Sequence, residues 1–231
     1  YRTYKTQQEL QQNYEMLMHR LRPLIGKGLA AAIYTQTTDV EGEVNGLMTY
    51  DRALVKLDAK RVRKLHEKFY LPPPIIETLN YASTSEKAAQ TWRITTTKPA
   101  DGWTKSDFDD SKWKEAPGGF GEKSTPGSVV RTEWKSKDIW LRRKFFLNEL
   151  AGDVFLRAHH DEDAEIYLNG KQVAELTGYV TDYIDVPLPK AHEILHSGQN
   201  TLAVHCKQTL GGQYIDVGVV GIIESPRERK E

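Results

Sequence analysis

The sequence predicts a mainly β fold, a two-sheet sandwich of jelly-roll type, preceded by a short α/β segment. Residues 1–70 follow the order helix, strand, loop, helix, whereas residues 71–90 lose helical periodicity and gain Pro, Ser, Thr and Asn. Residues 91–225 carry short β-branched or aromatic segments separated by turn residues. We therefore expect an α/β domain over 1–70, a linker over 71–90 and a sandwich over 91–225.

The first helix is expected near Thr6, because Thr6 and Glu9 have the spacing of a capping box. Its apolar stripe has three- and four-residue intervals, at Leu10, Tyr14, Leu17 and Leu21. Its predicted stop is formed by Pro23, Gly26 and Gly28. The run Leu29–Gln36 lacks polar alternation, as in a parallel strand that is covered on both faces.

A second helix is expected to begin with Asp58 as N-cap, and to end where Pro72, Pro73 and Pro74 forbid continuation. Its inner side carries Val62, Leu65 and Phe69. A helix, strand, loop, helix order is typical of a barrel or a doubly wound sheet. One strand cannot close a sheet, so this part is expected to belong to a larger α/β domain that begins before Tyr1.

Seven strands are predicted in the sandwich, over 91–97, 139–147, 153–159, 164–168, 171–175, 201–208 and 214–224. The clearest hairpin joins 164–168 to 171–175, where Asn169 and Gly170 accept the positive φ angles of a type I′ turn. The one cysteine, Cys206, lies in an apolar run and is expected in the core.

Composition excludes several partners. The 231 residues carry 32 Lys and Arg against 32 Asp and Glu, so no net field draws the chain to nucleic acid or to an anionic membrane. No apolar run approaches the roughly 20 residues that a membrane-spanning helix needs. Residues 1–20 are too polar for a signal peptide. The mixed-charge tail 226–231 is expected to fray and to hold no site.

The segment Thr35–Arg52, with the sequence TQTTDVEGEVNGLMTYDR, resembles the eighth strand and following loop of family 2 glycoside hydrolases, the β-galactosidase and β-glucuronidase group. Later motifs are similar to the galactose-binding-like modules appended to such enzymes, namely Trp103, 108–110, Trp113, 118–121, 138–143 and 163–170. The resemblance implies the last part of a (β/α)8 barrel, followed by a galactose-binding-like sandwich, in an enzyme that cleaves β-glycosides. It also implies a periplasmic or extracellular location.

Enzymes of this family use two glutamates, separated by about 5 Å, as acid/base and nucleophile. The resemblance puts both before Tyr1, so no catalytic residue is assigned and this chain alone is expected to be inactive. The pocket rim remains, with polar side chains that are expected to bind sugar hydroxyls: Gln36, Thr38, Asp39, Glu41, Glu43 and Asn45. In the alternative, Asp39 and Asn45 satisfy loop N–H groups, while Glu41 and Glu43 are solvated.

All five tryptophans lie in the first part of the sandwich. Trp92 and Trp140 fall within strand patterns and are expected in the core. Trp103, Trp113 and Trp134 lie in polar loop sequence and are candidates for an exposed platform on which sugar rings stack. Packing of the long loops is the competing role for these three.

The stretch from His159 to Glu165 resembles a metal site in composition. Adjacent histidines in a strand point to opposite faces, so His159 and His160 do not share an ion. Asp161 and Asp163 could supply oxygens to a structural calcium ion, which needs roughly six to eight. A solvated turn is the alternative. Of the adjacent Arg142 and Arg143, one could face a ligand groove, although pairing with an acid is the default.

Three functions stay open at this point. The sandwich could support the barrel or gather carbohydrate for a glycoside hydrolase, could be a stand-alone carbohydrate-binding module, or could be a structural interdomain module without ligand. No cofactor is expected. The expected partners are carbohydrate and the rest of the parent barrel, and a second copy of the chain could instead cover the apolar stripe of the first helix.

Overall fold

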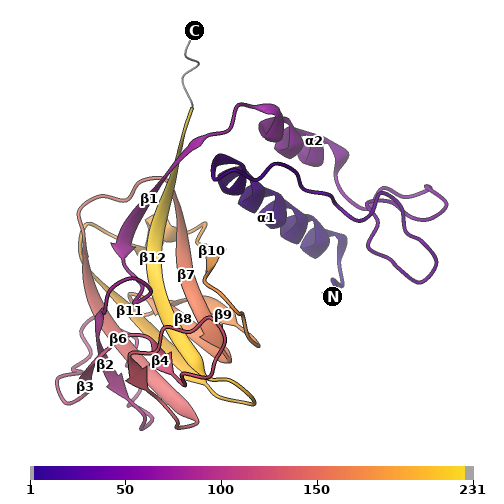
Figure 1. The fold of residues 1–231 in the computed structure, drawn as a ribbon. Coiled ribbons are helices and arrows are strands. Elements are labelled where there is room, and N and C mark those ends of the chain that lie inside the picture. Colours follow the sequence, from indigo (N-terminus) through magenta and orange to yellow (C-terminus); the bar gives the residue numbers. More distant parts are fainter. Residues whose placement is uncertain (1–2, 227–231) are drawn as a thin grey trace. The chain divides into compact units, whose positions relative to one another are not determined.

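The computed structural model describes residues 3–226, and the chain divides into two compact units, Tyr1–Glu77 with Glu224–Glu231 and Thr78–Ile223. Figure 1 shows helices in the first unit and antiparallel strands in the second. The expected frayed tail falls on residues 226–231, of which 227–231 lie outside the described residues. Within the described part of the chain, no helix is both long and apolar enough to cross a membrane.

Helix α1 (Gln7–Gly26) begins as predicted, with the Thr6 hydroxyl accepting a hydrogen bond from the Glu9 N–H at 3.1 Å. The reciprocal bond of the capping box is displaced by one residue, because the Glu9 carboxylate accepts from the Lys5 N–H. Of the residues predicted to form the stop, Pro23 lies inside the helix, which ends at Gly26. Pro23 therefore removes one hydrogen bond near the end of the helix without ending it.

Helix α2 (Ala59–Glu67) has the predicted Asp58 cap, whose Oδ1 accepts from the N–H groups of Lys60 and Arg61. A 3₁₀ turn, η1 (Lys68–Tyr70), extends it. Tyr14, Met18 and Leu57 form a small core, against which the predicted inner side of α2 and η1 packs. Leu17 departs from the predicted stripe, since it is exposed.

The strand predicted over Leu29–Gln36 does not form. The backbone runs on without a regular element after α1, and Ile33 is 91% exposed. Among the described residues, no backbone N–H from Ala30 to Thr35 donates to a backbone carbonyl. A strand is defined by pairing with a neighbour, and this unit supplies none to these residues.

The second unit is sandwich-like and holds two sheets of six strands among residues 3–226. One sheet has the order β10-β7-β12-β4-β5, with β1 paired to β12, and the other has the order β3-β2-β6-β11-β8-β9. The strands are β1 (Ile75–Ala82), β2 (Thr91–Thr95), β3 (Lys114–Pro117), β4 (Phe120–Gly121), β5 (Thr132–Glu133), β6 (Asp138–Leu147), β7 (Asp153–Asp161), β8 (Asp163–Leu168), β9 (Lys171–Leu176), β10 (Ile184–Pro187), β11 (Gly198–Lys207) and β12 (Tyr214–Ser225). A short helix, α3 (Ala191–Ile194), lies before β11.

The seven predicted strands are all present, within a few residues of the expected ends. The β8–β9 hairpin is also confirmed: Asn169 and Gly170 both have positive φ, at 49° and 83°. Alternate residues of the strands point into one apolar core between the sheets, which includes Leu156, Ile166, Val204 and the predicted Cys206. Trp92 and Trp140 are buried, as expected.

The linker predicted over 71–90 instead contributes a strand, because β1 pairs with β12. The segment that follows, residues 83–90, is held by three guanidinium groups. Arg143 donates to the Ser83 carbonyl and the Gln90 side chain, Arg131 donates to the Ser85 carbonyl, and Arg157 makes a two-bond ion pair with Glu86. Its Ser and Thr content therefore marks a tightly bonded loop and not a spacer.

Asp216 lies beneath this loop. Its Oδ2 accepts hydrogen bonds of 2.6 Å from the Ser85 N–H and from the Tyr183 hydroxyl. Burial raises the pKa of the Asp216 carboxyl to about 6, although the two donors and the nearby Arg143 favour the charged form. Burial also raises the pKa of the Asp161 carboxyl, with the neighbouring Glu162 as the second cause.

We expect the contribution of Asp216 to the stability of the second unit to fall between pH 4 and pH 6. A carboxyl whose pKa is higher in the folded than in the unfolded protein stabilises the fold fully below the unfolded value, and this contribution is lost as the pH rises through the folded value. For Asp216 the loss is on the order of 3 kcal/mol. Asp161 acts in the same direction, so Asp216→Asn should reduce the pH slope without abolishing it.

Urea unfolding at pH 4, 5 and 6 measures this slope. The matched control is Asp153→Asn, which changes an exposed aspartate on strand β7 of the same sheet. It should retain the wild-type slope. Equal slopes for Asp216→Asn and the unmodified chain would contradict the role assigned to Asp216.

Candidate functional site

The predicted rim residues lie in one loop, residues 35–57, between the extended segment and α2. Gln36 and Asn45 come together: the Gln36 amide N–H donates to the Asn45 side-chain oxygen at 3.0 Å and to a Glu43 carboxylate oxygen at 3.4 Å. The Tyr34 hydroxyl donates to the Asn45 carbonyl. These four residues form a polar cluster where the apolar run 29–34 ends, and we call it the amide cluster.

Asp39 has a different task. Its Oδ1 accepts from the Gly46 N–H at 2.9 Å and from the Lys56 ammonium at 2.5 Å, while Lys56 also donates to the Val44 carbonyl. The hydrogen bond from Lys56 holds the pKa of the Asp39 carboxyl below its ordinary value, and the Gly46 N–H acts in the same direction. Asp39 therefore has the alternative role, in which its side chain accepts a hydrogen bond from a backbone N–H group of the loop.

Gly46 is required at the centre of the loop. A Cβ at this position would lie 2.2 Å from the Asp39 nitrogen and 2.3 Å from the Thr38 carbonyl carbon. The loop closes so tightly here that a side chain has no room. Gly42, at the exposed turn of the same loop, would place a Cβ in open space.

The remaining predicted rim residues are not brought into the amide cluster. Thr38 is half-buried and pairs through its backbone with Met48. Glu41 is exposed, at a turn with positive φ. The sequence reading missed Tyr34, Gly46 and Lys56, and of these only the glycine has a sequence signal, since Asn45-Gly46 is a typical turn pair.

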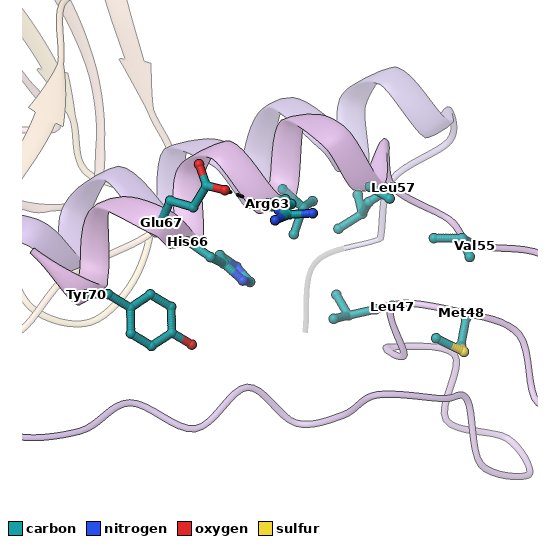
Figure 2. A pocket seen from close by; sticks show the side chains of 10 residues that line it. Leu47, Met48, Val55, Leu57, Arg63, His66, Glu67 and Tyr70 are labelled. Atoms are coloured by element: carbon teal, nitrogen blue, oxygen red, sulfur yellow. Dashed lines mark hydrogen bonds and ion pairs between the residues drawn. The ribbon is translucent and has the colours of Figure 1, made fainter.

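The other side of the loop borders an open pocket of about 540 Å³ (Figure 2). Leu47, Met48, Val55 and Leu57 supply apolar lining from the loop. Helix α2 and η1 contribute polar side chains, namely His66, Tyr70 and the Arg63–Glu67 ion pair. The Tyr14 hydroxyl lies 2.8 Å from the Nε2 atom of His66, within hydrogen-bond distance.

The chemistry open to the amide cluster is recognition. Gln36 and Asn45 keep a side-chain oxygen and N–H groups beyond the bond they share, and such groups bind hydroxyls in both directions. Two catalytic carboxylates would have to face each other across a substrate. Here Asp39 is paired, and Glu43 is exposed beside an amide. The loop therefore carries binding groups and no acid–nucleophile pair.

The three tryptophans proposed as a sugar platform differ in exposure. Trp134 is 3% exposed and its indole N–H donates to Ser136, so the expectation of an exposed ring is wrong. The polar residues next to Trp134 in the sequence gave no sign that its ring lies in the core. Trp103 and Trp113 are half-buried, with edge contacts to Tyr167 at 5.5 Å and to Phe108 at 6.0 Å.

Asp161 and Asp163 do not form a calcium site. The Asp163 Oδ1 accepts from the Gly178 N–H, and Asp161 is buried. In the part of the chain that the structure describes, no three His, Cys, Asp or Glu side chains come close enough to hold a metal ion. The donor set is too small for an ion that requires six or more oxygens.

No family model matches the sequence, and no curated protein does so. Solved structures are similar in part. A glycosyl hydrolase family 2 member from Bacteroides cellulosilyticus is 18% identical with a TM-score of 0.45, over 62% of this chain and 20% of that chain. A β-glucuronidase from Bacteroides uniformis is 22% identical with a TM-score of 0.43, over 63% and 18%.

A β-glucuronidase from an uncultured Clostridium is 15% identical with a TM-score of 0.42, over 66% of this chain and 30% of that chain. The chain therefore spans a small part of each of these three proteins. Each likeness covers a part of a protein that is described as a family 2 glycosyl hydrolase or as a β-glucuronidase.

The contrast between Gly46 and Gly42 gives a test of the loop. Gly46→Ala should destabilise the first unit by about 1–3 kcal/mol, the range typical of overpacking, and should displace the amide cluster. Gly42→Ala should change stability by less than about 0.5 kcal/mol, as surface substitutions do. Amide NMR spectra and urea unfolding report both effects, and similar behaviour of the two variants would refute the tight closure at Gly46.

Proposed function

We propose that this chain is the C-terminal region of a glycoside hydrolase acting on β-glycosides. In this proposal, residues 1–70 are the last part of a (β/α)8 barrel. The second unit is a jelly-roll, galactose-binding-like module that supports the barrel or gathers carbohydrate. The catalytic glutamates belong to other parts of the parent enzyme, and this chain contributes binding groups at the pocket rim.

One observation carries the proposal. The apolar run Leu29–Tyr34 lies exposed, its backbone N–H groups from Ala30 onward are not bonded to other backbone, and it leads directly into the amide cluster. An apolar strand with polar binding groups at its carboxyl end is the arrangement of a barrel strand, whose neighbours cover it and whose following loop meets the ligand. Parallel strands of the parent barrel are the partners that this segment would pair with.

The module has a second candidate role, as a carbohydrate-binding surface in its own right. Trp103 and Trp113 favour it, because each ring is partly accessible and is held by an edge contact with another aromatic ring. Rings fixed in this way present a stacking surface for the apolar C–H face of a sugar without a large ordering cost.

The isolated chain should not hydrolyse nitrophenyl β-glycosides. It should bind β-glycosides weakly through the amide cluster, and Gln36→Ala should weaken that binding by about tenfold, as expected for losing hydrogen bonds to a hydroxyl. Isothermal titration with methyl β-galactoside, β-glucoside and β-glucuronide measures the affinities. Glu41→Gln, at the exposed turn of the same loop, is the matched control and should bind like the unmodified chain.

Turnover by the isolated chain would contradict the assignment of catalysis to the parent's other parts. Binding that is insensitive to Gln36→Ala but lost in Trp103→Ala would favour the stand-alone carbohydrate-binding role. Flat titrations with every glycoside would leave the module as a structural element, and would reject the rim as a binding site in this chain.

A further inference from the structure

A second cavity, of about 310 Å³, lies on the outer face of the β3-β2-β6 sheet. This volume is at the lower end of the range, roughly 300–1,000 Å³, that holds small molecules. Its charged residues come from neighbouring strands and one loop: Arg93, Asp110, Glu115, Arg142, Arg143 and Lys144. The cavity belongs entirely to the second unit and is distinct from the amide cluster.

Strand register explains why these charges meet. Arg93 on β2 is the direct partner of Glu115 on β3 and of Arg142 on β6. Lys144 follows two residues after Arg142 and therefore projects to the same face. Arg143, between them, also lines the cavity, and its guanidinium donates to the Ser83 carbonyl and to the Gln90 side chain.

Two guanidinium groups directly opposite each other in a sheet repel, so this face needs anions. Asp110 supplies one, 2.7 Å from the Arg142 Nε, and Glu115 supplies another, 2.9 Å from Arg93. Lys144 has no ion-pair partner among residues 3–226. Four positive and two negative residues leave an excess of positive charge at the cavity.

Arg142 gives an independent indication that this cavity takes an anion. It is fully buried, its Nη1 donates to the Trp103 carbonyl, and its Nη2 has no hydrogen-bond acceptor among the described residues. A buried guanidinium N–H without an acceptor is costly, and Arg142 lines this cavity. One further oxygen acceptor carrying negative charge would complete the site.

We propose that this cavity binds a small carboxylate, with Lys144 and Arg93 as the accessible positive groups and Arg142 as the buried charge behind them. The excess positive charge matches an anion, and a carboxylate offers two oxygens to donors on adjacent strands. Glu115 competes with the ligand for Arg93. The size of the cavity fits a monosaccharide acid, and this inference does not depend on the proposed function.

The full chain should be titrated with sodium D-glucuronate, sodium acetate and D-glucose, followed by NMR of backbone amides. Glucuronate should bind more tightly than glucose, and weaken as salt is added. Lys144→Met should weaken glucuronate binding about tenfold, because it removes a charge-assisted hydrogen bond. Glu115→Gln should strengthen it, since the competing carboxylate is removed.

The matched control is Lys207→Met, an exposed lysine on β11 in the same sheet, which should leave affinity unchanged. Acetate binding as tightly as glucuronate would support a site that recognises the carboxylate alone, whereas tighter glucuronate binding would support a sugar acid. Absence of saturable carboxylate binding, or equal affinity for glucose, would overturn the proposal. So would Lys144→Met and Lys207→Met behaving alike.

Discussion

The structure depends on one constraint: a strand is stable only if its backbone N–H and C=O groups find partners. In the second unit, the ladders of two mainly antiparallel sheets meet this requirement, and the apolar sides of the strands then close over a common core. In the first unit, the run Leu29–Tyr34 has the side chains of a buried strand but no ladder, so it stays exposed. The same physical rule thus separates a closed fold from an open one within a single chain.

This rule also explains which elements could be predicted from the sequence. The seven β-branched or aromatic strands, the Asn169-Gly170 turn and the caps at Thr6 and Asp58 are local signals, and all are observed. The sequence predicts a linker where β1 forms, because its partner, β12, is far away in the sequence. Periodicity cannot reveal a pairing between segments that distant.

The sequence predicts where the candidate site lies in the chain better than it predicts what each residue of the site does. Sequence reading located the polar loop, but not that Asp39 would anchor Lys56 and Gly46 while Gln36 reached Asn45. Those bonds depend on how the loop closes on itself. The prediction that Trp134 is exposed is wrong for a related reason. Charged neighbours in the sequence do not prevent a loop from placing an indole ring in the core.

The loop 83–90 has a consequence for modularity. Arg131, Arg143 and Arg157 direct their guanidinium groups into it, and Asp216 accepts from its backbone. A sandwich excised at residue 91, where strand-like sequence resumes, would leave Arg131 and Arg143 without their acceptors in this loop and Arg157 without Glu86. The buried Asp216 would lose the Ser85 N–H. If evolution has transferred this module between proteins, the transferable cassette must therefore carry the irregular stretch ahead of its second strand.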